Sequence, residues 1–230
     1  MEYQGKEVRM VIKIDGDIIS NDWKPAYDWY GITSTCPRDV TDLLNLAEEG
    51  EPIDVKINSG GGDVLAGQEI YTILRGRPDV NIEIESLAAS AASVIAMAGH
   101  CLISPVGMVM IHNVSTYGAS GNHQELEKIA HTLRKWDEAL ASAYVAKTGR
   151  EKKEILQLME KETWLPADRA VELGFVDGIT QPAAGLTNMQ LGGMQVTPDM
   201  LARYKAEKKK RDDRETEKQS ILNSLMMYGV

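Results

Sequence analysis

Short apolar segments rich in β-branched residues alternate with helical patterns along most of this sequence of 230 residues. Strands are predicted at residues 8–14, 53–57, 81–85, 101–104, 108–112 and 175–179, and helices at 38–49, 64–74, 90–98, 122–147 and 166–173. Such alternation predicts repeated βαβ units around a largely parallel sheet, which is the α/β fold class. Because functional groups in these sheets gather at the carboxyl ends of the strands, we expect a site there.

Residues 122–147 carry a clear helical period. Apolar side chains recur three or four residues apart at Leu126, Ile129, Leu133, Trp136, Leu140 and Tyr144. Asn122 and Glu125 form the pattern of a capping box, and Gly149 provides the stop. A helix of this length spans about 39 Å and should protrude beyond the sheet. We expect another subunit to cover its apolar stripe; an internal helix lying across the sheet is the alternative.

The chain is predicted to have one folded domain followed by a tail. Residues 1–180 form the domain, and residues 181–197 are rich in Gly, Gln and Met without a clear period, which is typical of a linker. Residues 198–230 are charged and predict a solvated helix, because both signs of charge are densely mixed there.

The composition and short motifs exclude several classes of function. A formal net charge of −9 disfavours an extended phosphate-binding surface, so no nucleic-acid partner is expected. Two cysteines make no disulfide framework. The longest apolar run, residues 87–99, is shorter than the about 20 residues of a spanning helix, and the N-terminus lacks a signal-peptide pattern. We therefore expect a cytoplasmic protein that does not contact a membrane.

Metal and cofactor sites are not expected either. The candidate ligands His100, Cys101, His123 and His131 do not have the spacing of a zinc site. The glycine-rich segment Asn58-Ser-Gly-Gly-Gly-Asp63 follows a predicted strand, but it lacks the Lys-Ser/Thr of a phosphate loop. Its backbone N–H groups fit an oxyanion hole, with a plain structural turn as the alternative.

Three further segments place reactive side chains at predicted strand ends or helix starts. Small residues crowd Ser90 and Ser93 where a strand gives way to a helix, and free N–H groups at a helix start favour negative charge. These serines would also suit a tightly packed helix in which they bond their own backbone. His112 ends an apolar strand, and Glu162 precedes the short helix at 166–173.

In this order, the segments resemble the Clp protease proteolytic subunit family. Asn58-Ser-Gly-Gly-Gly62 is similar to the family's Asn-Ser-Pro-Gly-Gly loop, and Leu87-Ala-Ala-Ser90 to its Gln-Ala-Ala-Ser motif. Met110-Ile-His112 resembles its Met-Ile-His motif. The segment from Glu162 to Asp177 resembles the block that holds the family's acid, normally Asp. The resemblance covers about residues 8–179.

The resemblance implies a ClpP/crotonase-like fold and the roles of a serine peptidase. Ser90 would be the nucleophile, His112 the general base and then acid, and Glu162 the acid that orients His112. The N–H groups of Gly61 and Ala91 would form the oxyanion hole. The long helix would be the family's protruding handle, in homo-oligomeric, stacked heptameric rings that cleave polypeptide substrates inside a chamber.

Several departures from the family pattern refine this expectation. Gly60 replaces the usual Pro, Ala91 the usual Met and Glu162 the usual Asp, and an extra stretch lies at 23–35. Few residues precede the first predicted strand, so axial loops for an ATPase are not expected, and cleavage is predicted to be ATP-independent, with an ATPase partner left open. These departures resemble the phage and prophage branch, which processes capsid or scaffold proteins during head maturation.

Two other functions remain open at this point. A crotonase-type acyl-CoA enzyme would share the fold and a backbone oxyanion hole without needing Ser90 and His112. A catalytically inactive ClpP-like shell would retain only the assembly. Within the peptidase interpretation, Ser93 is the alternative to Ser90 and Glu160 the alternative to Glu162.

Overall fold

The computed structural model describes residues 9–48, 50–181 and 209–210. The chain divides into two units, Met1–Gln181 and Pro182–Val230, and every element named below belongs to the first. Within the predicted charged helix at 198–230, Lys209 and Lys210 are helical. The rest of that prediction, and all but the first residue of the predicted linker, lie outside the described residues.

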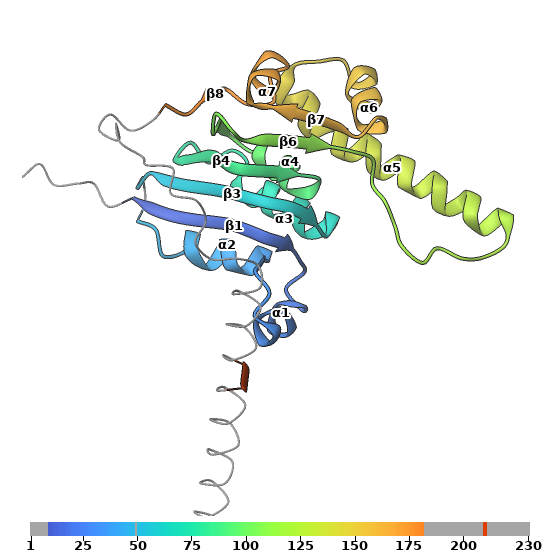
Figure 1. Ribbon diagram of the computed structural model, residues 1–230, viewed down its shortest axis with the longest axis horizontal. Helices are drawn as coiled ribbons and strands as arrows, with labels where there is room; N and C mark the ends of the chain where they lie inside the picture. Colours follow the sequence, from blue (N-terminus) through green and yellow to red (C-terminus); the bar gives the residue numbers. More distant parts are fainter. Residues whose placement is uncertain (1–8, 49, 182–208, 211–230) are drawn as a thin grey trace, which may run out of the picture. The chain divides into compact units, whose positions relative to one another are not determined.

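A mixed sheet forms the centre of the first unit and confirms the α/β class (Figure 1). The parallel part has the order β2 (Ser34–Thr35), β1 (Met10–Ile18), β3 (Ile53–Gly62), β4 (Val80–Ala89), β5 (His100–Ile103) and β8 (Gly178–Ile179). β6 (Met108–Ile111) pairs in parallel with β4, and β7 (Thr163–Pro166) pairs antiparallel with β6. The β7 strand and its pairing were not predicted from the sequence.

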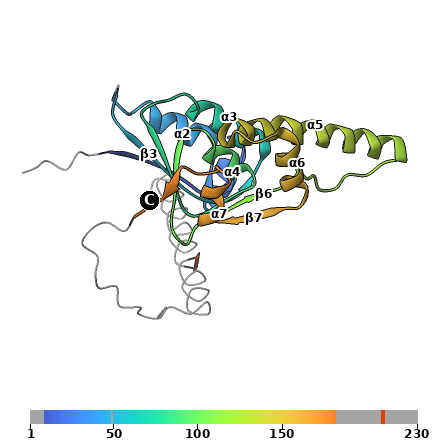
Figure 2. The same cartoon turned by 90° about the horizontal axis from the view of Figure 1, so that it is seen from above.

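Helices bury the apolar faces of these strands. Ile12, Ile57 and Ile84 are completely buried, as expected of parallel strands with covered faces. The helices are α1 (Lys24–Tyr30), α2 (Pro37–Leu44), α3 (Val64–Leu74), α4 (Ala91–Ala96), α5 (His123–Thr148), α6 (Lys152–Glu160) and α7 (Ala167–Glu172). α3 packs against α2 and α4, and α2, α3 and α5 lie on the same side of the sheet (Figure 2). The extra stretch at 23–35 forms α1 and β2.

Two strands run farther than the sequence predicted, and both lead to the candidate site. β3 continues through the glycine-rich segment to Gly62, because Gly62 lies so close to β1 that an added Cβ would be 2.1 Å from the Ile18 carbonyl oxygen. β4 pairs with β5 in its first half and with β6 in its second half, and ends at Ala89. The predicted loop at 58–63 is therefore mostly strand, and Ser90 follows a strand directly.

The long helix α5 begins and ends where the sequence predicts. The Asn122 side chain accepts the N–H groups of Gln124 and Glu125, and Glu125 accepts the Asn122 N–H in return. The C-terminal half of α5 is buried against the core through residues such as Leu140, while its N-terminal half extends away from the sheet (Figure 1). The expected protruding helix is thus present.

Candidate active site

Ser90 occupies a strained position between β4 and α4. Its backbone has φ 53° and ψ −124°, a conformation that costs a non-glycine residue about 1–3 kcal/mol. The Ser90 N–H donates to the Met110 carbonyl at 2.9 Å, which ties this junction to β6. Small neighbours make the turn possible: a Cβ on Gly61 would lie 2.7 Å from the Ser90 Cβ. The crowding by small residues noted in the sequence therefore reflects close backbone approach at Ser90.

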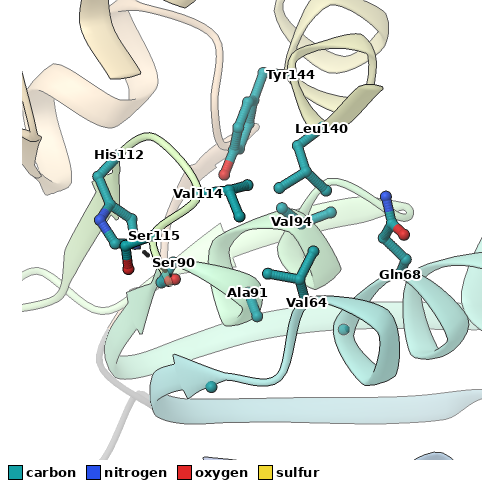
Figure 3. Close-up of a pocket in the computed structure, with 12 residues that line it drawn as sticks. Val64, Gln68, Ser90, Ala91, Val94, His112, Val114, Ser115, Leu140 and Tyr144 are labelled. Carbon is teal, nitrogen blue, oxygen red and sulfur yellow. Dashed lines mark hydrogen bonds between the residues drawn. The ribbon is translucent and has the colours of Figure 1, made fainter. Parts of the chain in front are cut away.

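His112 and Ser90 form a hydrogen-bonded pair. The distance from His112 Nε2 to Ser90 Oγ is 2.8 Å (Figure 3). Pairing between β4 and β6 sets this distance, because Ala89 lies opposite Met110. Ser90 directly follows β4, and His112 directly follows β6. An imidazole at this distance can take the hydroxyl proton of an attacking serine.

Ser93, the alternative nucleophile, is fully buried and already engaged. Its Oγ donates to the Ser90 carbonyl at 2.6 Å and lies 2.7 Å from the Tyr144 hydroxyl. These bonds give Ser93 a structural place behind the junction, whereas Ser90 faces a pocket.

The two expected oxyanion-hole residues lie side by side. A Cβ on Gly61 would come within 3.0 Å of the Ala91 nitrogen, and the Ala91 N–H has no hydrogen-bond partner among the described residues. The Gly61 N–H, however, donates to Ser59 Oγ at 3.0 Å. Ala91 thus presents a free donor at the start of α4, while the Gly61 donor is occupied in this arrangement.

The backbone of Glu162 lies close to that of His112, but the Glu162 side chain forms no hydrogen bond with the imidazole. Ile111 and Thr163 are the last paired residues at this end of the antiparallel strands β6 and β7, so His112 and Glu162 are the next residues beyond the pair. The Glu162 carboxylate is exposed and accepts the Trp164 Nε1–H at 3.2 Å. Ser90 and Glu162 are the non-glycine residues with positive φ in the described part of the chain.

Asp137 is a site-adjacent carboxylate that the sequence analysis missed. It lies on α5 with 7% of its surface exposed, and its Oδ1 accepts the Val114 N–H at 2.7 Å. Burial raises the pKa of Asp137, while the Val114 N–H and the charge of His112 lower it by less. The sequence did contain a sign of it, since Asp137 is three residues before Leu140 on the face that carries the apolar stripe.

A pocket lined by both apolar and polar groups opens beside Ser90 (Figure 3). Its apolar lining comes from α3, α4, α5 and the segment after β6: Val64, Ala91, Val94, Val114 and Leu140. Gln68 and Ser115 add polar side chains to the wall, and Tyr144 also lines it. Such a pocket suits an apolar side chain of a ligand whose reacting group lies at Ser90.

Among residues 9–48, 50–181 and 209–210, no group of three or more His, Cys, Asp or Glu side chains could hold a metal ion. Both cysteines are buried, and burial raises the pKa of Cys101 to about 12, so its thiol stays protonated at neutral pH. None of the described helices has the length and apolar character needed to cross a bilayer.

An α/β sheet with a Ser–His pair and a free backbone N–H at its strand ends defines the class of serine hydrolases that work through an oxyanion hole. The chain belongs to the Clp protease family, which matches residues 32–183. The ATP-dependent Clp protease proteolytic subunit 1 of Chlamydia abortus is 31% identical over 141 residues, 59% of this chain and 73% of its own length. That of Chlamydia trachomatis serovar D is 32% identical over 142 residues, with the same shares.

Proposed function

We propose that this protein is a serine endopeptidase that cleaves polypeptides. The observation that carries the proposal is the 2.8 Å contact between His112 Nε2 and Ser90 Oγ, in a chain of the Clp protease family. Ser90 attacks the peptide carbonyl carbon while its proton passes to His112 Nε2. His112 then gives this proton to the leaving amine, and water hydrolyses the resulting acyl-enzyme by the same route.

The developing oxyanion is bound by backbone N–H groups. Ala91 supplies one donor without any rearrangement. Gly61 supplies the second donor after its N–H breaks its hydrogen bond to Ser59 Oγ and turns to the oxyanion. Because Gly61 already lies against the Ala91 nitrogen, this movement is small. Glu162 is the acid in this proposal, and its carboxylate turns from Trp164 to His112 when the site becomes active.

The pocket beside Ser90 gives the proposal a specificity. Aliphatic side chains from α3, α4, α5 and the segment after β6 line this pocket, so we expect cleavage after apolar residues and little cleavage after charged ones. A series of fluorogenic peptides that differ only in the residue before the scissile bond measures this preference through kcat/KM.

The active form is proposed to be a homo-oligomer of stacked heptameric rings. The support is the protruding half of α5, where Leu126 is 42% exposed and Ile129 and Leu133 are half-buried in one chain. Covering such a stripe with another subunit removes apolar surface from water. Light scattering that finds a monomer at micromolar concentration would contradict assembly, and a single ring would contradict stacking alone.

The proposed substrates are unfolded or flexible polypeptides in the cytoplasm, cut without ATP, with phage capsid or scaffold proteins as the natural case. The support is the resemblance to the phage and prophage branch. The relatives named above are called ATP-dependent, so the test is degradation of β-casein without ATP or any partner. If casein survives while a short peptide is cleaved, ATP independence is wrong and an activator is needed.

The central experiment compares Ser90→Ala with Ser93→Ala. Ser90→Ala should abolish both peptide hydrolysis and labelling by a fluorophosphonate, because the nucleophile is lost. Ser93→Ala should still be labelled, at a cost of about 1–3 kcal/mol in stability, because the buried Tyr144 hydroxyl loses its partner. A wild-type chain that is never labelled would indicate an inactive shell, and binding of coenzyme A in its place would favour the acyl-CoA enzyme.

A further inference from the structure

Asp137 has a placement that packing alone does not explain. It is the single Asp or Glu that is buried in the described part of the chain. Along α5 it lies between the protruding N-terminal half and the buried residues Leu140 and Tyr144. Burying a carboxylate is costly unless it is paired. No Lys or Arg of the described residues forms an ion pair with Asp137. Its carboxylate accepts a hydrogen bond from the N–H of Val114, which lies two residues after His112.

The segment that follows His112 depends on this contact. Outside the sheet, no backbone–backbone hydrogen bond among the described residues reaches residues 113–121. The 2.7 Å bond from the Val114 N–H to Asp137 Oδ1 therefore joins the chain after β6 to α5. Val114 and Leu140 also line the pocket, so the contact joins two elements of the pocket wall.

We propose that Asp137 is a positioning residue for His112: it anchors the segment after His112 through Val114 and places a negative charge on the α5 side of the imidazole. This inference rests on the proposed peptidase function. During acylation His112 holds the Ser90 proton on Nε2 and becomes an imidazolium until the leaving amine takes that proton. Asp137 takes no proton in this step. Its charge stabilises the imidazolium, and the burial of Asp137 together with the partial burial of His112 strengthens the attraction.

Asp137 and Glu162 approach His112 from different elements. Glu162 follows from the antiparallel pairing of β6 with β7, whereas Asp137 lies on α5. The two roles are compatible: Glu162 would contact the imidazole directly, and Asp137 acts through the backbone and through its charge.

Two substitutions separate the anchor from the charge. Asp137→Asn keeps an oxygen that accepts the Val114 N–H and removes only the charge. Asp137→Ala removes both. We expect kcat to fall by about tenfold in Asp137→Asn, equivalent to about 1.4 kcal/mol of barrier, with KM within about twofold. In Asp137→Ala we expect a fall of about 100-fold, because the His112 segment is no longer held in place.

Glu138→Gln is the matched control. Glu138 is the next residue of the same helix, and its side chain is exposed and contacts Lys135. It should keep wild-type kcat. Wild-type rates in both Asp137 variants would overturn the inference. If Asp137→Ala does not fold, the Asn variant alone decides.

A second measurement distinguishes a positioning role from a merely structural one. The rate of fluorophosphonate labelling of Ser90 is compared in wild-type and His112→Ala backgrounds. If Asp137 acts through His112, Asp137→Asn slows labelling in the wild-type background and has no further effect when His112 is absent. An equal loss in both backgrounds would overturn the inference. Failure of the proposed function is distinguishable, because then the wild-type chain itself would not be labelled at Ser90.

Discussion

Asp137 and Asp177 hold their carboxylates in opposite ways. Both accept a backbone N–H at 2.7 Å, Asp137 from Val114 and Asp177 from Cys101. Asp177, before β8, also forms an ion pair with Lys147, which in turn donates to the Gly99 carbonyl at 2.8 Å. Burial raises the pKa of Asp177, but the Lys147 and Cys101 hydrogen bonds outweigh it and the net pKa is lowered. Asp137 forms no ion pair with a Lys or Arg among the described residues, and its pKa is raised.

The same contrast extends to the backbone of the two regions. Beside β8, the positive φ of the turn after α7 falls on Gly174, where it costs little. At the site, positive φ falls not only on Gly61 and Gly62 but also on Ser90 and Glu162, where it is strained. At the β5–β8 edge the polar groups therefore stabilise the fold. At the carboxyl ends of β4 and β6 the backbone is strained where it holds the reactive groups in place, which lowers stability.

Gly61→Ala should produce the largest effect, because it disrupts the strained backbone at the candidate active site. The new Cβ would lie 2.7 Å from both the Ala89 oxygen and the Ser90 Cβ, at a φ of 96° that alanine resists. Displacing the Ser90 junction together with the Gly61 N–H of the proposed oxyanion hole should reduce kcat/KM by more than about 10⁴-fold. The matched control is Gly60→Ala, where an added Cβ meets no atom within 4 Å. Equal activity of the two variants would show that close packing at Gly61 is not required.

Glu162→Gln should be next in size. A neutral amide no longer stabilises the imidazolium, so we expect turnover to fall by about two to four orders of magnitude with little change in thermal stability. Trp164→Phe sharpens this test, because it removes the indole N–H that holds the carboxylate and should leave turnover at or above the wild-type value. Wild-type turnover in Glu162→Gln would remove this residue from the mechanism.

Asparagine at the two aspartates should lower thermal stability at Asp177 but not at Asp137. Asp177→Asn loses the Lys147 ion pair, and because Asp177 is partly exposed, solvent screening limits the loss to about 1 kcal/mol or less. Asp137→Asn removes a buried charge while keeping the Val114 bond, so the unfolding midpoint at pH 7 should stay constant or rise. Calorimetry of both variants measures the two signs. A lower midpoint in both would contradict the contrast between the regions.

The smallest expected effect is on the acid limb of stability. Because the pKa of Asp177 is lowered by folding, its contribution is present above the unfolded pKa of about 3.9 and is lost as pH falls through the folded value. The raised pKa of Asp137 has the opposite effect, since the folded state binds the proton more tightly and gains stability as pH falls. The acid loss should therefore flatten in Asp177→Asn and steepen in Asp137→Asn. Parallel pH curves for the two variants would contradict these assignments.

The resemblance to the Clp protease family, rather than local patterns alone, predicted the Ser90–His112 pair. Alternating strands and helices placed both residues at strand ends without assigning their roles, and the pairing of β4 with β6 brings them together. The extension of β3 through the glycines was not predictable in the same way, because glycine-rich segments usually form loops and this one is held as a strand by its pairing with β1 and, at Ser59, with β4.

Asp137 and β7 show a different limit of prediction. A single acid in an amphipathic helix is normally solvated, and nothing in the helical period shows that Val114 will lie against it. Likewise, Thr163–Pro166 is too short to be recognised as a strand until β6 lies beside it. Both features depend on contacts between segments that are far apart in the chain.

Helix α5 connects two events that would otherwise be independent. It runs without interruption for 26 residues from its exposed half to Leu140 and Tyr144 in the pocket wall. A subunit that binds the exposed half would restrict the tilt of the whole helix, and with it the order of the catalytic cavity. By thermodynamic linkage, a ligand that orders the cavity would strengthen that subunit contact by the same factor. Substrate occupancy and assembly would then share one coupling free energy, carried by a single rigid element.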